Sequence, residues 1–401
     1  MKLSIRSFVK DSILNIFVTF VPLVVLQFVV YPILAGSMTQ EQYGMMISCY
    51  SLMYLIGGTL GTELNRVRLV GDAKYVKEGL KGDFNIVLIG NIILGFISCI
   101  VFGNIFIDGM NVTDIALLSI TCVFIILNSY LDVGFRLILN YKHIAVVQLI
   151  NVIGYILGVF LFKISNMWIF VYLSGLILGF VYLISFTSLI KEPLRKTQFF
   201  KKTLFDDINL AFSGFLNRVL LYGDKILLLP LGGSEMVSIY YIATLIGKTV
   251  LMSIEPINTV MLSYLVKMKT ISMKNFQVVI ILLSTICAIG YAVCMVISKP
   301  LLNFLYPMWA EETTGLIWMV TLAMCISAMG NVINSFVLKE CTMQWQTIIN
   351  SIVIIVFIVL AVLLINIKGL FGYCIAVTVA YTVRLAIIIG VYYYQGKKRS
   401  V

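Results

Sequence analysis

The stretch TIINSIVIIVFIVLAVLLINI, at residues 347–367, contains no charged residue and is apolar almost throughout. An α-helix rises about 1.5 Å per residue, so roughly 20 apolar residues are enough to cross about 30 Å of hydrocarbon. This stretch reaches that length and is bounded by polar residues on both sides. It therefore predicts a helix that crosses a membrane.

Runs of similar length and character recur along the whole chain. Backbone groups in lipid must be satisfied within their own segment, and the alternating pattern of a membrane barrel strand is absent, so the runs predict helices. The fold class we predict is an all-α polytopic membrane protein with twelve transmembrane helices, at residues 13–34, 43–62, 84–106, 115–137, 144–162, 168–190, 208–229, 238–264, 277–297, 314–337, 347–367 and 370–394.

Composition supports a membrane protein and excludes several kinds of active site. Hydrophobic residues make up 61% of the 401 residues and charged residues 12%, whereas a soluble protein is nearer one quarter charged. The eight cysteines form no CxxC pair, His143 is the single histidine, and no phosphate-binding loop motif is present. We therefore predict no enzyme activity, no metal site and no cofactor.

The net charge of +11 is explained by membrane topology, so we predict no nucleic-acid partner. Lys and Arg concentrate on alternate loops and at both termini, and cytoplasmic segments are the ones that carry such an excess. The opposite side has Lys163, Lys299 and Lys368 alone. Both termini are therefore predicted to be cytoplasmic.

Two similar segments suggest an internal repeat. Pro32-Ile-Leu-Ala-Gly-Ser37 resembles Leu229-Pro-Leu-Gly-Gly-Ser234, at an offset close to half the chain. An even number of spans in each half gives parallel repeats related by an axis along the membrane normal. We predict two six-helix lobes around a central cavity, at residues 1–190 and 208–401, joined by a basic cytoplasmic linker at residues 191–207.

Ionisable residues near the middle of a span are the candidate functional residues, because a charge at that depth is costly and usually faces a cavity. The cations are candidates for substrate binding, and the acids for coupling to H⁺ or Na⁺. A structural role, in ion pairs that hold helices together, is the alternative for each. The cations are Arg218, Lys225, Lys248 and Arg384, and the acids are Asp224 and Glu255.

The balance of these charges is positive, and a positive cavity attracts phosphates and disfavours cationic drugs. Arginine suits bidentate phosphate contacts, and lysine acts as a point charge. In the first half, Glu63 with Arg66 and Asp132 with Arg136 have the spacing of ion pairs on one helix. We interpret these two pairs as structural clamps.

The region around Asp224 and Lys225 resembles part of a known family. The stretch Gly223-Asp-Lys-Ile-Leu-Leu-Leu-Pro-Leu-Gly-Gly-Ser234, followed by Ser238-Ile-Tyr-Tyr-Ile-Ala243, resembles the span 7–8 hairpin of bacterial polysaccharide-repeat flippases. The segments Glu41-Gln-Tyr-Gly44 and Gly61-Thr-Glu-Leu-Asn-Arg66 also resemble that family, which belongs to the multidrug/oligosaccharidyl-lipid/polysaccharide exporter superfamily.

The resemblance implies a flippase that moves undecaprenyl-diphosphate-linked oligosaccharide repeat units, for O-antigen in lipopolysaccharide biosynthesis or for capsule, across the inner membrane by alternating access. It implies a cationic central cavity, which agrees with the charges in the spans. Membrane lipids, a polysaccharide polymerase and a chain-length regulator are the further partners.

Three other classes of protein are alternatives to a polysaccharide flippase. A multidrug or other small-molecule secondary transporter of the same superfamily would need a more acidic or apolar cavity. A major-facilitator transporter would carry an acidic-basic signature after the second span, where Asn65 stands in the place of the expected Asp. A membrane glycosyltransferase or polymerase would need large loops outside the membrane, and the outer loops are short.

Overall fold

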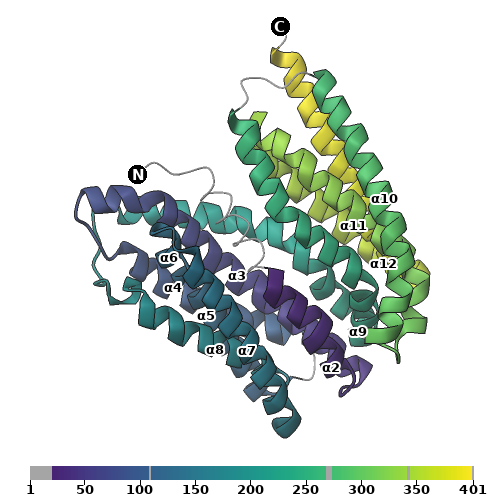
Figure 1. The fold of residues 1–401 in the computed structure, drawn as a ribbon, viewed down its shortest axis with the longest axis horizontal. Helices are drawn as coiled ribbons and strands as arrows, with labels where there is room; N and C mark the ends of the chain where they lie inside the picture. The colour runs from purple at the N-terminus through teal and green to yellow at the C-terminus, as the bar shows by residue number, and fades with distance from the viewer. Residues whose placement is uncertain (1–19, 108–109, 268–272, 341–343, 400–401) are drawn as a thin grey trace. The chain divides into compact units, whose positions relative to one another are not determined.

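The computed structural model describes residues 20–107, 110–267, 273–340 and 344–399, and it describes their side chains except those of residues 252–275, 338–344 and 395–399. The described part is helical and contains no strand, which confirms the all-helical prediction (Figure 1). Its elements are η1 (Leu26–Val30), α2 (Tyr31–Ala35), α3 (Gln40–Lys77), α4 (Asp83–Phe106), α5 (Val112–Leu131), α6 (Val133–Leu137), α7 (Tyr141–Ser165), α8 (Ile169–Phe186), η2 (Leu189–Lys191), α9 (Phe200–Lys267), α10 (Met273–Leu305), α11 (Ala310–Glu340) and α12 (Gln344–Arg399).

Within the described ranges, nine helices are long and apolar enough to cross a membrane, and Phe20–Ala35 forms a shorter apolar helix. Two of the nine are interrupted by a glycine. Gly233 breaks α9 at φ 82°, and Gly369 breaks α12 at φ 57°, in the conformations that favour glycine over other residues. The predicted spans on either side of these glycines are helical, and the total of twelve stays a prediction.

Apolar side chains cover the outside of several helices. On α10, for example, Ile281 and Ile289 are exposed at 66% and 61%. So large an apolar surface would drive a soluble protein to associate, whereas in a bilayer it faces lipid. The chain is a multi-pass membrane protein.

Helix α3 is longer than the predicted span at 43–62. It begins with a capping box made by Thr39 and Gln42 and continues to Lys77, into the segment 63–83 that the predicted spans at 43–62 and 84–106 left as a loop. Its 38 residues extend about 57 Å at 1.5 Å per residue, well beyond the hydrocarbon. The loop prediction was wrong for residues 63–77 because ion pairs on one helix, such as Arg68–Asp72, keep this polar segment helical.

The chain divides into two compact units, Met1–Ile226 (unit 1) and Leu227–Val401 (unit 2). In unit 1, α3 packs against α4 and α5, and α8 packs against α5 and α7. In unit 2, α11 packs against both α10 and α12, and Gly247 of α9 approaches Met324 of α11. The first part of α9 belongs to unit 1, whereas the predicted lobe boundary lies before it.

Helices α7 and α8 approach closely through glycines. Gly154 on α7 faces Gly175 on α8, and a Cβ atom added to Gly154 would lie 2.4 Å from the Cα of Gly175. Gly158 on α7 likewise lies against the backbone of Val171 on α8. Ser174 Oγ donates to the carbonyl of Gly154 at 2.7 Å across the same contact. Both helices thus carry a glycine pair spaced four apart, which lets backbones in a membrane approach closely.

Replacing Gly154 by alanine is expected to lower the free energy of unfolding by about 1–3 kcal/mol, because the new methyl group meets backbone that cannot rotate away. Gly90 on α4 is the matched control, since nothing lies within 4 Å of a Cβ atom added there. Unfolding in mixed micelles measures both variants. Equal stability of Gly154→Ala and Gly90→Ala would contradict the close approach.

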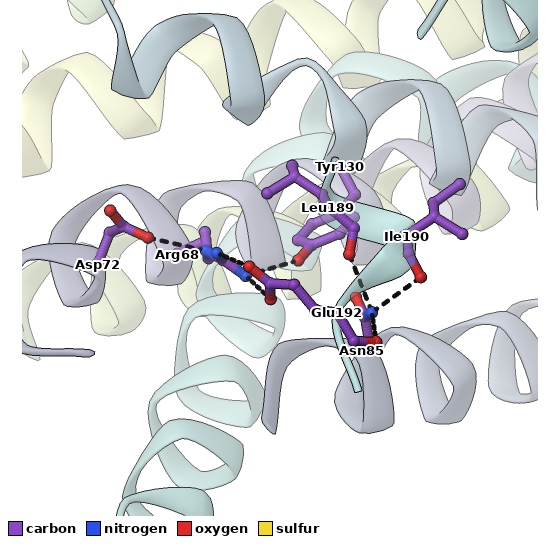
Figure 2. Close-up of polar contacts among 7 residues, drawn as sticks. All are labelled: Arg68, Asp72, Asn85, Tyr130, Leu189, Ile190 and Glu192. Carbon is purple, nitrogen blue, oxygen red and sulfur yellow. Dashed lines mark hydrogen bonds and ion pairs between the residues drawn. The ribbon is translucent and has the colours of Figure 1, made fainter. Parts of the chain in front are cut away.

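The segment between α8 and α9, residues 187–199, which we call the connector, is fixed to α3 by a buried ion pair (Figure 2). Arg68 donates to Glu192 through two nitrogen atoms, at 2.8 Å and 2.7 Å, and through Nε to Asp72 at 3.1 Å. The side chains of Arg68 and Glu192 are 7% and 9% exposed. A bidentate pair of this kind fixes both distance and orientation.

The connector is also held by α4. The side-chain amide of Asn85 donates to the carbonyls of Leu189 and Glu192, both at 3.0 Å, and lies 3.4 Å from that of Ile190 (Figure 2). These contacts give carbonyl groups of the connector a hydrogen-bond donor from α4. Together, Arg68, Asp72, Asn85 and Glu192 form what we call the connector lock.

A second set of hydrogen bonds secures the end of the connector and the start of α9. Asp83 accepts from the backbone nitrogen of Thr197 at 2.7 Å and from the hydroxyl of Tyr75 at 2.7 Å. The Tyr75 hydroxyl also lies 2.7 Å from the hydroxyl of Thr203 on α9. The predicted linker at 191–207 is therefore partly helical, from Phe200 onward, and its contacts tie it to unit 1.

Candidate substrate site

Arg218 lies midway along the part of α9 between Phe200 and Gly233, where α9 meets α3. Its Nη2 atom donates to the hydroxyl of Thr62 at 3.0 Å. The guanidinium lies against Gly58, where an added Cβ atom would come within 3.0 Å of Nη1. No carboxylate pairs with Arg218 in the described part of the chain, and its side chain is half-buried. A cation with a neutral partner keeps its charge available for an anion.

Tyrosine side chains continue this contact between α3 and α9. The ring of Tyr222, one helical turn after Arg218, lies 6.3 Å from the ring of Tyr54 and 6.5 Å from that of Tyr50. We call the set Tyr50, Tyr54, Gly58, Thr62, Arg218 and Tyr222 the α3–α9 seam. Its α3 members are spaced four apart, so they lie along one face of that helix.

Asp224 and Lys225 form a buried ion pair beside the seam. Lys225 Nζ lies 3.2 Å from Asp224 Oδ1, and the same oxygen accepts from the Lys225 backbone nitrogen at 3.0 Å. Lys225 Nζ is also 5.8 Å from the centroid of the Tyr222 ring. Because each charge neutralises the other, the pair can hold the structure together without binding a substrate or an ion. This structural role is the alternative to the predicted functional one.

The remaining predicted residues lie in unit 2. Lys248 on α9 is buried. Arg384 on α12 is buried as well, and its Nη1 atom donates to Asn331 of α11 at 2.7 Å, while its Nε atom has no hydrogen-bond partner among the described residues. Glu255 lies outside the residues whose side chains are described. Arg218, Asp224 and Lys225 thus lie in the part of α9 that belongs to unit 1, whereas Lys248 and Arg384 lie in unit 2.

Both ion pairs predicted in the first half are confirmed. Glu63 pairs with Arg66 at 2.9 Å, and Asp132 pairs with Arg136 at 2.7 Å. Glu63 also lies against the α9 backbone, since a Cβ atom added to Gly214 would meet its Oε1 atom at 2.5 Å. Its carboxylate is therefore part of the packing between α3 and α9.

One buried carboxylate near this region, that of Asp207, was not among the predicted site residues. Asp207, in the second turn of α9, accepts from Asn91 of α4 at 3.0 Å, and its Oδ1 atom has no hydrogen-bond partner among the described residues. The predicted spans placed Asp207 in the linker, one residue before span 7. The signal that could have found it is Asn91, a polar residue well inside an apolar run.

Comparison with known proteins identifies the fold. The sequence matches no protein-family model and no curated protein. Among solved structures, the lipid II flippase MurJ in an inward closed conformation aligns with a TM-score of 0.67 at 16% identity, over 95% of this chain and 85% of that one. An inward-facing multidrug resistance MATE family transporter of the MOP superfamily aligns with a TM-score of 0.64 at 11% identity, over 97% and 98%.

A MOP superfamily transporter from Pyrococcus furiosus Vc1, described as having a binding pocket of reverse polarity that suggests a different function, aligns with a TM-score of 0.56 at 11% identity, over 98% of this chain and 96% of that one. These neighbours are transporters and a flippase, not enzymes. At sequence identities this low, the alignments establish the fold and do not identify the substrate. The chain has the fold of the MOP-superfamily membrane transporters.

Proposed function

We propose that this protein is a flippase that moves undecaprenyl-diphosphate-linked oligosaccharide repeat units across the bacterial inner membrane by alternating access. The observation that carries the proposal is Arg218, a half-buried cation in the middle of a span that no carboxylate neutralises among the described residues. A diphosphate is the anion that such a guanidinium binds well, through two parallel hydrogen bonds.

The finer features of the sequence prediction belong to this proposal. Twelve spans are consistent with nine long apolar helices in the described ranges, the two glycine breaks and the helix Phe20–Ala35. Cytoplasmic termini follow from the Lys and Arg distribution. Lys225, Lys248 and Arg384 are proposed as further cations on the substrate path, and Asp224 and Glu255 as groups that couple transport to H⁺ or Na⁺.

Export of small cationic molecules is the alternative function, and the multidrug transporters among the structural neighbours favour it. The half-buried positive charge of Arg218 opposes it, because a cationic substrate would be repelled at close range. The charge of Arg218 therefore favours an anionic substrate.

Transport by the purified protein in liposomes tests the proposal. One set of vesicles contains a polyprenyl diphosphate that carries a fluorescently labelled N-acetylglucosamine, and a membrane-impermeant reductant reports which leaflet holds the label. We expect the protein to increase the reducible fraction well above that of empty vesicles, and to leave ethidium accumulation unchanged. Ethidium transport without movement of the lipid would establish the multidrug alternative instead.

A further inference from the structure

Five tyrosines of unit 1 form one aromatic cluster. Tyr31 of α2 and Tyr172 of α8 are buried, and they lie 6.0 Å and 5.1 Å from the ring of Tyr50. Tyr50 and Tyr54 on α3 are 4.5 Å apart and, like Tyr222 on α9, half-buried. The cluster therefore has a buried base and an outer layer of Tyr50, Tyr54 and Tyr222, which belongs to the α3–α9 seam.

The outer layer is continuous with the cation of the seam. Along α3, Tyr54 is followed one turn later by Gly58, against which the Arg218 guanidinium lies. Along α9, Tyr222 is one turn from Arg218, a separation of about 6 Å along the helix axis. Tyrosine faces and a guanidinium thus lie next to each other, within the length of a sugar residue and the phosphate attached to it.

This combination suits a glycosyl diphosphate. A pyranose ring presents C–H bonds on its faces and hydroxyl groups at its edge, whereas the face of an aromatic ring carries partial negative charge. A sugar can therefore stack on a tyrosine while its hydroxyl groups exchange hydrogen bonds with phenol groups nearby. Leucine or phenylalanine would pack equally well against lipid or in a core, without the hydroxyl groups.

We propose that Tyr50, Tyr54 and Tyr222 form the binding surface for the first sugar residues of the substrate, next to the diphosphate contact at Arg218. This inference rests on the proposed function, because it assigns the sugar end of the same substrate. With this assignment, the three tyrosines are the residues that distinguish a glycan-carrying lipid from the bare lipid diphosphate.

Binding to the full-length protein in nanodiscs tests the assignment with two probes, a polyprenyl diphosphate and the same lipid diphosphate carrying N-acetylglucosamine. We expect the wild type to bind the sugar-carrying lipid about tenfold more tightly, which corresponds to about 1.4 kcal/mol, because the sugar gains aromatic contacts that the bare lipid lacks. Tyr54→Leu and Tyr222→Leu should remove most of this preference and keep the affinity for the bare lipid. Tyr54→Phe should retain the stacking part of it.

Tyr141→Leu is the matched control, because Tyr141 is a half-buried tyrosine of unit 1 at the start of α7, away from the cluster. Arg218→Ala should weaken the binding of both probes equally. Equal wild-type affinity for the two probes, or a preference that survives in both leucine variants, would overturn the tyrosine site and leave the proposed function standing. Failure of the wild type to bind either probe would overturn both.

Discussion

Replacing Arg218 by alanine is expected to slow transport of the diphosphate-linked glycan by about 10- to 100-fold. A hydrogen bond to a charged group contributes about 1.5–3 kcal/mol, and each 1.4 kcal/mol corresponds to a factor of ten. The stability of the protein should change by less than about 1 kcal/mol, since the hydrogen bond described for Arg218 is to the Thr62 hydroxyl. The liposome assay and thermal unfolding measure the two effects separately.

Two variants sharpen this test. Lys163→Ala removes one positive charge from an exposed position at the end of α7 and should leave transport unchanged. Gly58→Ala keeps the charge of Arg218 but places a methyl group 3.0 Å from its Nη1 atom, so it should displace the guanidinium and give an intermediate rate. Unimpaired transport by Arg218→Ala at normal abundance would rule out Arg218 as a substrate contact.

Replacing Arg68 by alanine is expected to lower the free energy of unfolding by about 3–5 kcal/mol, because the change leaves the carboxylate of Glu192 buried without its partner. Arg68→Lys should recover part of the loss, since lysine keeps the charge and loses the bidentate geometry. Unfolding in mixed micelles, followed by circular dichroism, measures the three proteins.

The pair Arg136–Asp132 provides the matched control for Arg68. It has the same 2.7 Å separation, but its side chains are more exposed, at 35% and 18%. Partly exposed pairs contribute about 0–1 kcal/mol, so Arg136→Ala should cost much less than Arg68→Ala. Similar losses in the two variants would show that burial does not set the strength of the connector lock.

The membrane spans were predictable because lipid imposes a minimum apolar length on every helix that crosses it. That constraint acts locally, and the predicted spans coincide with helical segments over most of their described residues. It does not act on residues 63–77, which lie beyond the predicted span, and there the continued helix of α3 was missed. The pairing of Arg68 with Glu192 was missed for a different reason, since 124 residues separate the partners and neither lies in a predicted span.

The candidate site was partly predictable. Arg218 could be singled out because its charge lies in an apolar run, where water cannot reach it easily. The tyrosines could not, because an aromatic residue is favourable in a span whether it meets lipid, a core or a ligand. Gly154 and Gly158, with Gly175 and Gly179, had a spacing visible in the sequence, and only the contact between α7 and α8 shows what the glycines are for.

The connector lock sets an order of events during synthesis of the chain. Arg68 leaves the ribosome 124 residues before Glu192, a delay of roughly 6–25 seconds at typical rates of translation. During that interval the guanidinium has no carboxylate on the connector to bind, so α3 and α4 enter the membrane before their polar ends can be joined. The connector lock can therefore close only after α8 and the connector have been synthesised.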